Sequence, residues 1–248
     1  MIKYITYSII LLISVNSYSQ SKDTTNIDKH TQSRFTPGVF WRFTGLVPRV
    51  GKQGPRYDRL IVDLYHNTWL GERNSINPKW YSIGFNASFM FDIPFNDKST
   101  VSMGIGLGFS HLNIHYNGML GIDSTRTSTT LMPVPASSPD RRLNKFVANY
   151  IQIPLEFRFR TPGVKHFKFH VGAVIGVRLN SYERWKEGNL KFKEFNQPDV
   201  ARFRYGVTAR IGIRNWSIYG AYYFSDIFTN SNSSKLNPLC IGISVSLF

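Results

Sequence analysis

Apolar and polar positions alternate with a period of two from about Tyr81 to the end of the chain. Across residues 81–92, every odd position carries an aromatic residue, isoleucine or alanine. Every even position carries serine, glycine, asparagine, methionine or aspartate. Successive side chains of a β-strand point to opposite faces, so this segment has one apolar face and one polar face. The pattern predicts a sheet with two chemically different surfaces.

Eight segments have the length and composition of strands that cross a bilayer at a tilt. Short connections (94–99, 161–165 and 214–215) alternate with longer ones (67–79, 117–145, 181–201 and 226–237). Short periplasmic turns that alternate with long outer loops, and an even number of strands, are typical of outer-membrane barrels. The predicted strands are 59–66, 80–91, 100–116, 146–160, 166–180, 202–214, 216–225 and 238–248.

The polar face of these strands is rich in glycine and arginine, as in residues 202–214. A barrel of about eight strands has an interior just wide enough for side chains, so glycine there makes room for arginine. A soluble barrel needs the reverse arrangement, and in hydrocarbon every backbone polar group must pair within a closed sheet. We therefore predict an all-β protein, an eight-stranded antiparallel up-and-down transmembrane β-barrel with an N-terminal extension, located in the cell outer membrane.

The first residues have the features of a secretory signal peptide. Lys3 precedes a short apolar run at 5–15, and Ser17 and Ser19 are the small residues that a signal peptidase reads. We predict a signal peptide at 1–19, an N-terminal periplasmic extension at 20–57 and the barrel domain at 58–248. The single cysteine, Cys240, excludes an intrachain disulfide, and we expect it to be a small buried filler.

The chain of 248 residues has a formal net charge of +15. Nucleic acid is a common partner of such a charge, but many of the arginines lie on alternating strands, so we predict no nucleic-acid partner. Outer-membrane lipids and lipopolysaccharide phosphates are the better partners for exposed lysine and arginine.

The predicted lumen face carries an excess of cations over carboxylates. Arginine binds a carboxylate through two hydrogen bonds, so Glu156 is expected to pair with Arg210 or Arg158. We favour a structural network that fills the narrow barrel; the alternative is a path for anions. The predicted lumen charge cluster is Glu156, Arg158, Arg178, Arg204 and Arg210, and Asp63, Asp92, Arg160, Lys168, Arg202 and Arg214 share its face.

Two further chemistries have candidate residues and little support. His111 and His115, with His66, suggest a metal site, but three convergent ligands are needed and residues 110–113 shift in parity as a β-bulge does. A lipid hydrolase needs a nucleophile, a base and an orienting group in contact, and a set drawn from Ser110, His111 and Asp123 is arbitrary. We predict no enzyme activity, no catalytic residues, no metal and no cofactor.

Aromatic residues near the strand ends predict two interfacial girdles. The loop at 123–143, rich in Ser, Thr and Pro, is expected to be mobile and solvent-facing. The expected girdle toward the long loops is Trp69, Trp80, Tyr81, Tyr116, Phe146, Tyr182, Trp185, Phe224 and Phe228. The girdle toward the short turns is Phe91, Phe95, Phe159, Phe167 and Trp216.

The segment 149–157 (NYIQIPLEF), the glycine-containing stretch 171–176 (VGAVIG) and the final strand 241–248 (IGISVSLF) resemble the porin-like, PorT-type family of small outer-membrane barrels. The resemblance covers 58–248 and implies handling by the barrel-assembly machinery. Phe248 departs from it, because the terminal aromatic residue is out of phase with the apolar face. One branch of that family is associated with a secretion apparatus. The resemblance thus implies a structural role or one in a secretion or envelope assembly; a narrow porin-like anion channel and a lipid hydrolase stay as alternatives.

Overall fold

The computed structural model describes residues 60–71, 76–95, 100–137, 140–161, 167–195 and 197–247. The predicted signal peptide at 1–19, the predicted extension at 20–57 and Phe248 lie outside these residues. In the described ranges, no helix has the length and apolar character needed to cross a membrane.

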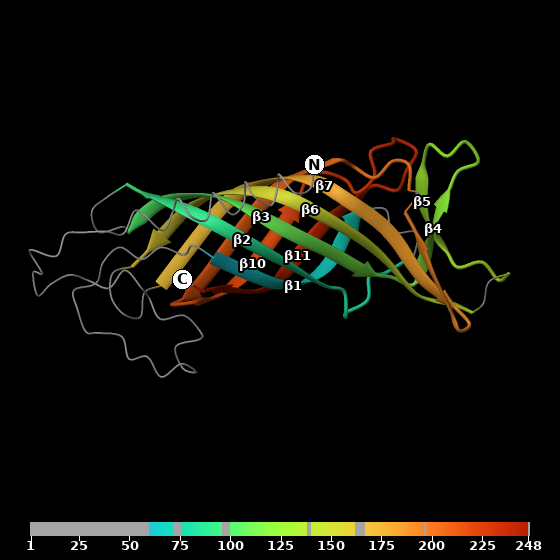
Figure 1. The fold of residues 1–248 in the computed structure, drawn as a ribbon, viewed down its shortest axis with the longest axis horizontal. Helices are drawn as coiled ribbons and strands as arrows, with labels where there is room; N and C mark the ends of the chain where they lie inside the picture. Colours follow the sequence, from blue (N-terminus) through green and yellow to red (C-terminus); the bar gives the residue numbers. More distant parts are fainter. Residues whose placement is uncertain are drawn as a thin grey trace, which may run out of the picture.

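Eight antiparallel strands form the wall of a closed barrel in the described part of the chain (Figure 1). They follow each other in the order β6-β3-β2-β1-β11-β10-β9-β7, and pairing of β6 with β7 closes the ring. The predicted eight-stranded, up-and-down, all-β barrel is confirmed. Its strands are β1 (Leu60–Gly71), β2 (Ile83–Pro94), β3 (Val101–His115), β6 (Arg141–Arg160), β7 (Phe167–Glu187), β9 (Phe203–Ile213), β10 (Trp216–Tyr223) and β11 (Leu236–Ser246).

Three further strands lie at the end of the barrel that carries the long connections, which we call the outer end (Figure 1). β4 (Gly118–Ile122) and β5 (Thr129–Pro133) pair as a separate hairpin, and β8 (Leu190–Glu194) pairs with the outer part of β7. β1, β6 and β7 also extend further outward than predicted, to Gly71, from Arg141 and to Glu187 respectively. The connections 117–145 and 181–201 are therefore partly strand.

The outer surface of the wall is apolar around the whole ring, as the parity of the sequence predicts. Leu107 on β3 is 59% exposed and Ile175 on β7 is 61% exposed, while the intervening positions on the same strands face the interior. A continuous surface of this kind needs hydrocarbon, not water, around it. We call this surface the apolar belt; it includes Leu64, Ile83, Phe89, Ile105, Leu107, Ile153, Phe157, Val171, Ile175, Val207, Ile211, Ile218, Ile241 and Ile243.

The polarity of the two faces reverses above the belt, at the outer end. On β3 the inward positions from 104 to 108 are glycines, and the next ones outward are Ser110, Leu112 and Ile114, of which the last two are fully buried. The strand alternates without interruption, so the predicted bulge at 110–113 is wrong. The side chains change character because the surroundings change: above a bilayer the exterior is water, and apolar residues must turn inward.

The girdle prediction holds at the inner end and fails in part at the outer end. Phe91, Phe95, Phe159, Phe167 and Trp216 are all exposed, and at the outer end Trp80 is 84% exposed. In contrast, Trp69, Tyr116, Phe146 and Phe228 are buried above the belt. Trp69 and Phe146 occupy inward positions of β1 and β6, and Tyr116 and Phe228 lie in isolated bridges outside the strands. These four residues pack inside the barrel and do not contact the interface.

Candidate functional site

The interior of the belt region holds a buried ion-pair network centred on Glu156. Arg158, two residues along the same strand, donates from Nε and Nη2 to Glu156 Oε2 at 3.0 Å each. Arg210 contacts the other carboxylate oxygen, and His170 Nδ1 lies 3.8 Å from Oε2. All four side chains are buried. A buried carboxylate is stable only when its charge is paired in this way.

Arg210 on β9 reaches across the lumen rather than along the wall. Its Nε and Nη2 donate to the two carboxylate oxygens of Asp63 at 3.1 and 2.7 Å. Asp63 lies on β1, which is separated from β9 by β10 and β11, and Glu156 on β6 is separated from β9 by β7. One guanidinium therefore joins three separated parts of the wall, and the interior at this level is occupied by side chains.

Asp92 on β2 completes the network at the inner end. Its carboxylate accepts from Arg160 Nη2 at 2.7 Å and also contacts Arg158. Arg158 fits because Gly104 stands opposite: a Cβ at Gly104 would lie 2.7 Å from Arg158 Nε. The absence of a side chain at Gly104 therefore leaves the space for Arg158 that glycines on the polar face were expected to provide.

We expect Gly104→Val to destabilise the barrel by about 1–3 kcal/mol, because the new side chain displaces the Arg158 guanidinium from its two carboxylates. The measurement is the midpoint of urea unfolding in lipid vesicles. Gly220→Val is the matched control, since a Cβ there meets no atom within 4 Å. Equal loss in both variants would show that glycine matters only for strand backbone.

Arg204 is buried in a second arrangement that the sequence did not reveal. Its guanidinium lies between the rings of Tyr150 and Tyr223, 3.8 and 4.0 Å from their centroids. Its Nη2 donates to Ser110 Oγ at 2.9 Å and to Gln152 Oε1 at 3.1 Å. Aromatic faces attract a cation, so these rings offset part of the cost of removing the Arg204 guanidinium from water. For Arg158 and Arg210, carboxylates offset that cost.

The predicted cluster is thus brought together only in part. Glu156, Arg158 and Arg210 share one network, whereas Arg204 lies among aromatic rings and Arg178 lies near the outer end. Arg178 is half-buried and donates from Nη1 to the Val200 carbonyl at 2.6 Å. Of the residues assigned to the same face, Lys168 is buried and donates to Ser246 Oγ at 2.8 Å, while Arg202 and Arg214 are exposed at strand ends.

An apolar plug fills the interior above the ionic network. Trp69 packs on Tyr116 with ring centroids 5.4 Å apart, and the β4–β5 hairpin adds Leu120 and Leu131. Leu131 and Thr129 are buried, so the expectation of a solvent-facing loop at 123–143 is wrong for the first part of β5. It holds for the exposed tip at 123–127 and for the exposed residues 132–133 and 135–137. The plug consists of Trp69, Ile76, Leu112, Ile114, Tyr116, Leu120, Leu131, Phe146, Ala148, Val200, Ile227, Phe228 and Leu236.

Polar contacts hold the hairpin over the barrel. Glu183 accepts from Tyr116 OH at 2.7 Å, from the Leu120 backbone N–H at 3.2 Å and from Arg141 Nη2 at 2.9 Å. Burial raises the pKa of Glu183 despite these donors, and burial beside Glu183 raises the pKa of Tyr116 well above its usual value. On the other side, Thr129 and Ser233 both contact Asp199.

The histidines and the serine considered for metal or hydrolase chemistry do not converge. Ser110 is buried in the lumen, His111 is on the outward face bonded to Asn149 at 2.7 Å, and Asp123 is in the β4–β5 turn. His115 packs on Tyr81 with ring centroids 4.8 Å apart. In the described ranges no group of three His, Cys, Asp or Glu side chains is placed to hold a metal ion. Cys240 is buried, with Sγ 3.2 Å from Asn67 Oδ1.

Burial, then the charges of Lys145 and Lys79, lower the pKa of His115 to about 4. Because this pKa lies below the ordinary value of 6.5, the unfolded chain binds more protons than the folded one between pH 4 and pH 6.5. The stability due to the neutral imidazole therefore declines as the pH falls from 6.5 toward 4. We expect an NMR titration to show this depressed midpoint, and Lys145→Gln to raise it. A midpoint near 6.5 in both proteins would contradict the local field described here.

A closed barrel with an apolar exterior, a charged interior and a filled lumen defines the class of small transmembrane β-barrels. The chain belongs to the family of the outer membrane protein beta-barrel domain, whose model matches residues 59–229. The protein is accordingly located in the outer membrane.

Two solved structures of one protein, Ail, the attachment invasion locus protein of Yersinia pestis, are similar at low identity. The first is 11% identical, with a TM-score of 0.33, and covers 75% of this chain and 95% of Ail. The second holds the heparin analogue sucrose octasulfate; it is 12% identical, with a TM-score of 0.32, and covers 75% and 96%. No curated protein matches the sequence.

Proposed function

We propose that this outer-membrane barrel is a non-enzymatic, structural component of the cell envelope, of the PorT-like kind, that acts within a secretion or envelope assembly. The observation that carries the proposal is the filled lumen. Arg210 joins Asp63 and Glu156 across the interior, and the apolar plug lies above that layer. Such an interior holds the wall rigid and leaves the outer surface to make contacts.

The surface above the belt supports a role in assembly. Met132 and Leu190 are exposed apolar side chains at the outer end, beyond the apolar belt. Exposed apolar groups in water favour contact with another protein. Photo-crosslinking side chains at Met132 and Leu190 should give protein adducts in native membranes, with Leu107 on the belt as the control that gives lipid adducts. Lipid-only adducts at all three positions would contradict an assembly role.

A narrow anion channel is the second candidate, because the buried cations Arg158, Arg160, Lys168, Arg204 and Arg210 outnumber the lumen carboxylates of Asp63, Asp92 and Glu156. Planar-bilayer recording of the pure protein separates the two functions. Our proposal predicts no current steps above the lipid baseline. Reproducible, anion-selective steps would replace it with the channel.

A lipid hydrolase is tested separately. Because Ser110 and His111 point to opposite faces of β3, we expect no lipid turnover by the purified protein. Turnover that is lost on His111→Ala would restore the hydrolase.

A further inference from the structure

The outer ends of β6 and β7, together with β8, form a three-stranded sheet that projects beyond the belt (Figure 1). Residues directly paired across antiparallel strands share a face. One row of such partners is Lys145, Arg184 and Lys193, and the next is Arg142, Lys186 and Lys191. We call this set of six cations the basic face.

The carboxylates of these strands lie on the opposite parity. Glu183 is buried against the hairpin. In the strand register, Glu187 on β7 stands opposite Arg141 on β6, and Glu194 on β8 stands opposite Glu183. Like charges directly opposite each other are destabilising, so a bound anion would stabilise the two rows of three cations. Burial and the charge of Arg184 lower the pKa of Lys145, which is consistent with a strongly positive surface.

A register shift creates the second row. Arg184 and Lys186 are two residues apart on β7, but their partners on β6, Lys145 and Arg142, are three residues apart. Without the extra residue, Leu143 would stand opposite Lys186. Leu143 instead has a φ of +55°, which a leucine rarely adopts. Strained backbone of this kind concentrates at functional sites, and here its effect is to place Arg142 beside Lys186.

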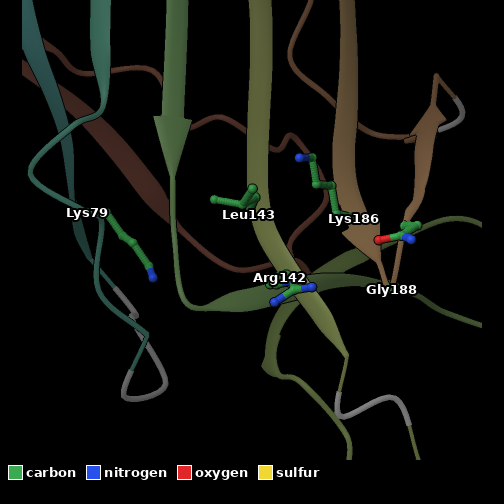
Figure 2. A pocket seen from close by; sticks show the side chains of 6 residues that line it. Lys79, Arg142, Leu143, Lys186 and Gly188 are labelled. Carbon is green, nitrogen blue, oxygen red and sulfur yellow. The ribbon is translucent and has the colours of Figure 1, made fainter.

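The same bulge opens a hollow of about 390 Å³ in the basic face (Figure 2). Lys79 comes from the segment before β2, Arg142 and Leu143 from β6, and Lys186 from β7. Gly188 and Asn189, in the β7–β8 turn, complete the lining. Three cations therefore border one open hollow, an arrangement suited to a phosphate group.

The height of the basic face above the belt points to a membrane lipid. On β7 the belt ends at Leu179. Beyond it, Tyr182 is half-buried, and the centroid of its ring lies 5.6 Å from that of Phe195. Lys193 Nζ lies over both rings, at 4.0 and 4.4 Å. Aromatic residues mark the interface. Arg184 is five residues beyond Leu179, roughly 16 Å along the tilted strand, and so lies a short way beyond the outer edge of the apolar belt.

We propose that the basic face binds the phosphate groups of lipopolysaccharide in the outer leaflet around the barrel. The lipid occupies the apolar belt with its acyl chains, and its phosphates contact the two rows of cations and the hollow. The binding is non-covalent and does not depend on the role proposed above, because it requires only the barrel in its membrane.

The test uses the full chain in phosphatidylcholine nanodiscs, titrated with lipopolysaccharide and with the same lipopolysaccharide after enzymatic dephosphorylation. The triple variant Lys145→Gln/Arg184→Gln/Lys186→Gln should lose affinity for the phosphorylated form by about 100-fold, about fivefold for each cation near the surface. In the wild type, the phosphorylated form should also raise the NMR-measured pKa of His115, whose neighbours include Lys79 and Lys145.

The matched control is Arg202→Gln/Arg214→Gln/Lys235→Gln, which removes the same charge at exposed positions away from the basic face. It should retain wild-type affinity. Equal losses in the two variants, or equal wild-type affinity for the dephosphorylated form, would overturn the proposal. So would tighter binding of soluble polyphosphate than of lipopolysaccharide, which would indicate a soluble ligand. The wild-type comparison of the two lipids decides the matter even if the triple variant does not fold.

Discussion

Glu156→Gln is expected to destabilise the barrel by about 3–5 kcal/mol, the usual cost of leaving a buried charge without its partner. The substitution keeps the shape of the side chain and removes a negative charge that Arg158 and Arg210 share. Asp63 and Asp92 still pair with these two arginines, so the fold survives with lower stability. The measurement is reversible urea unfolding in lipid vesicles, followed by tryptophan fluorescence.

The double variant Glu156→Gln/Arg158→Met isolates the electrostatic part of this loss of stability. It removes one cation together with the carboxylate, while Asp92 keeps Arg160 and Arg210 keeps Asp63. We expect it to be more stable than Glu156→Gln alone, since its remaining charges are paired. A double variant that is less stable than either single variant would show that packing, not charge, dominates at this layer.

Trp69→Ala is expected to cost about 3–5 kcal/mol, because it removes the largest buried side chain of the apolar plug and leaves a cavity against Tyr116. Local opening should accompany the loss, so amide exchange in the β4–β5 hairpin should accelerate. Urea unfolding and hydrogen exchange measure the two effects.

Trp80→Ala is the matched control, because Trp80 is exposed and its loss leaves no cavity. Its effect should stay within about 0.5 kcal/mol. If the two tryptophan variants were equally stable, Trp69 would lie at the membrane interface, as the sequence alone suggested, and not in the plug.

The wall of the barrel was predictable because its constraint is local. In a strand that has lipid on one side and a narrow lumen on the other, the type of each residue indicates which face it lies on, as for Leu107 and Gly108. The pair Glu156 and Arg210 was also within reach, since the two residues share the lumen parity and have opposite charge.

The outer end was not predictable from the same rule, because the rule reverses there. Leu112 and Ile114 keep their parity while water replaces lipid outside, and in the sequence this reversal looks the same as a bulge. The register shifts between β6 and β7 lie elsewhere, at Arg142–Lys145 and at Asn149–Tyr150. The first contains Leu143, where the residue type gives no signal because glycine or asparagine is the usual occupant of positive φ. The rings around Arg204 come from β6 and β10, which no local pattern relates.

The central claim is that Ile105, Leu107 and Phe109 face lipid while His111 and His115, on the same face of the same strand, face water. The direct test is a single-cysteine scan in a Cys240→Ser background, with Ile105→Cys, Leu107→Cys, Phe109→Cys, His111→Cys and His115→Cys in lipid vesicles. A membrane-impermeant maleimide should label the last two and leave the first three unlabelled until detergent is added. Rapid labelling of Leu107→Cys in intact vesicles would contradict the account.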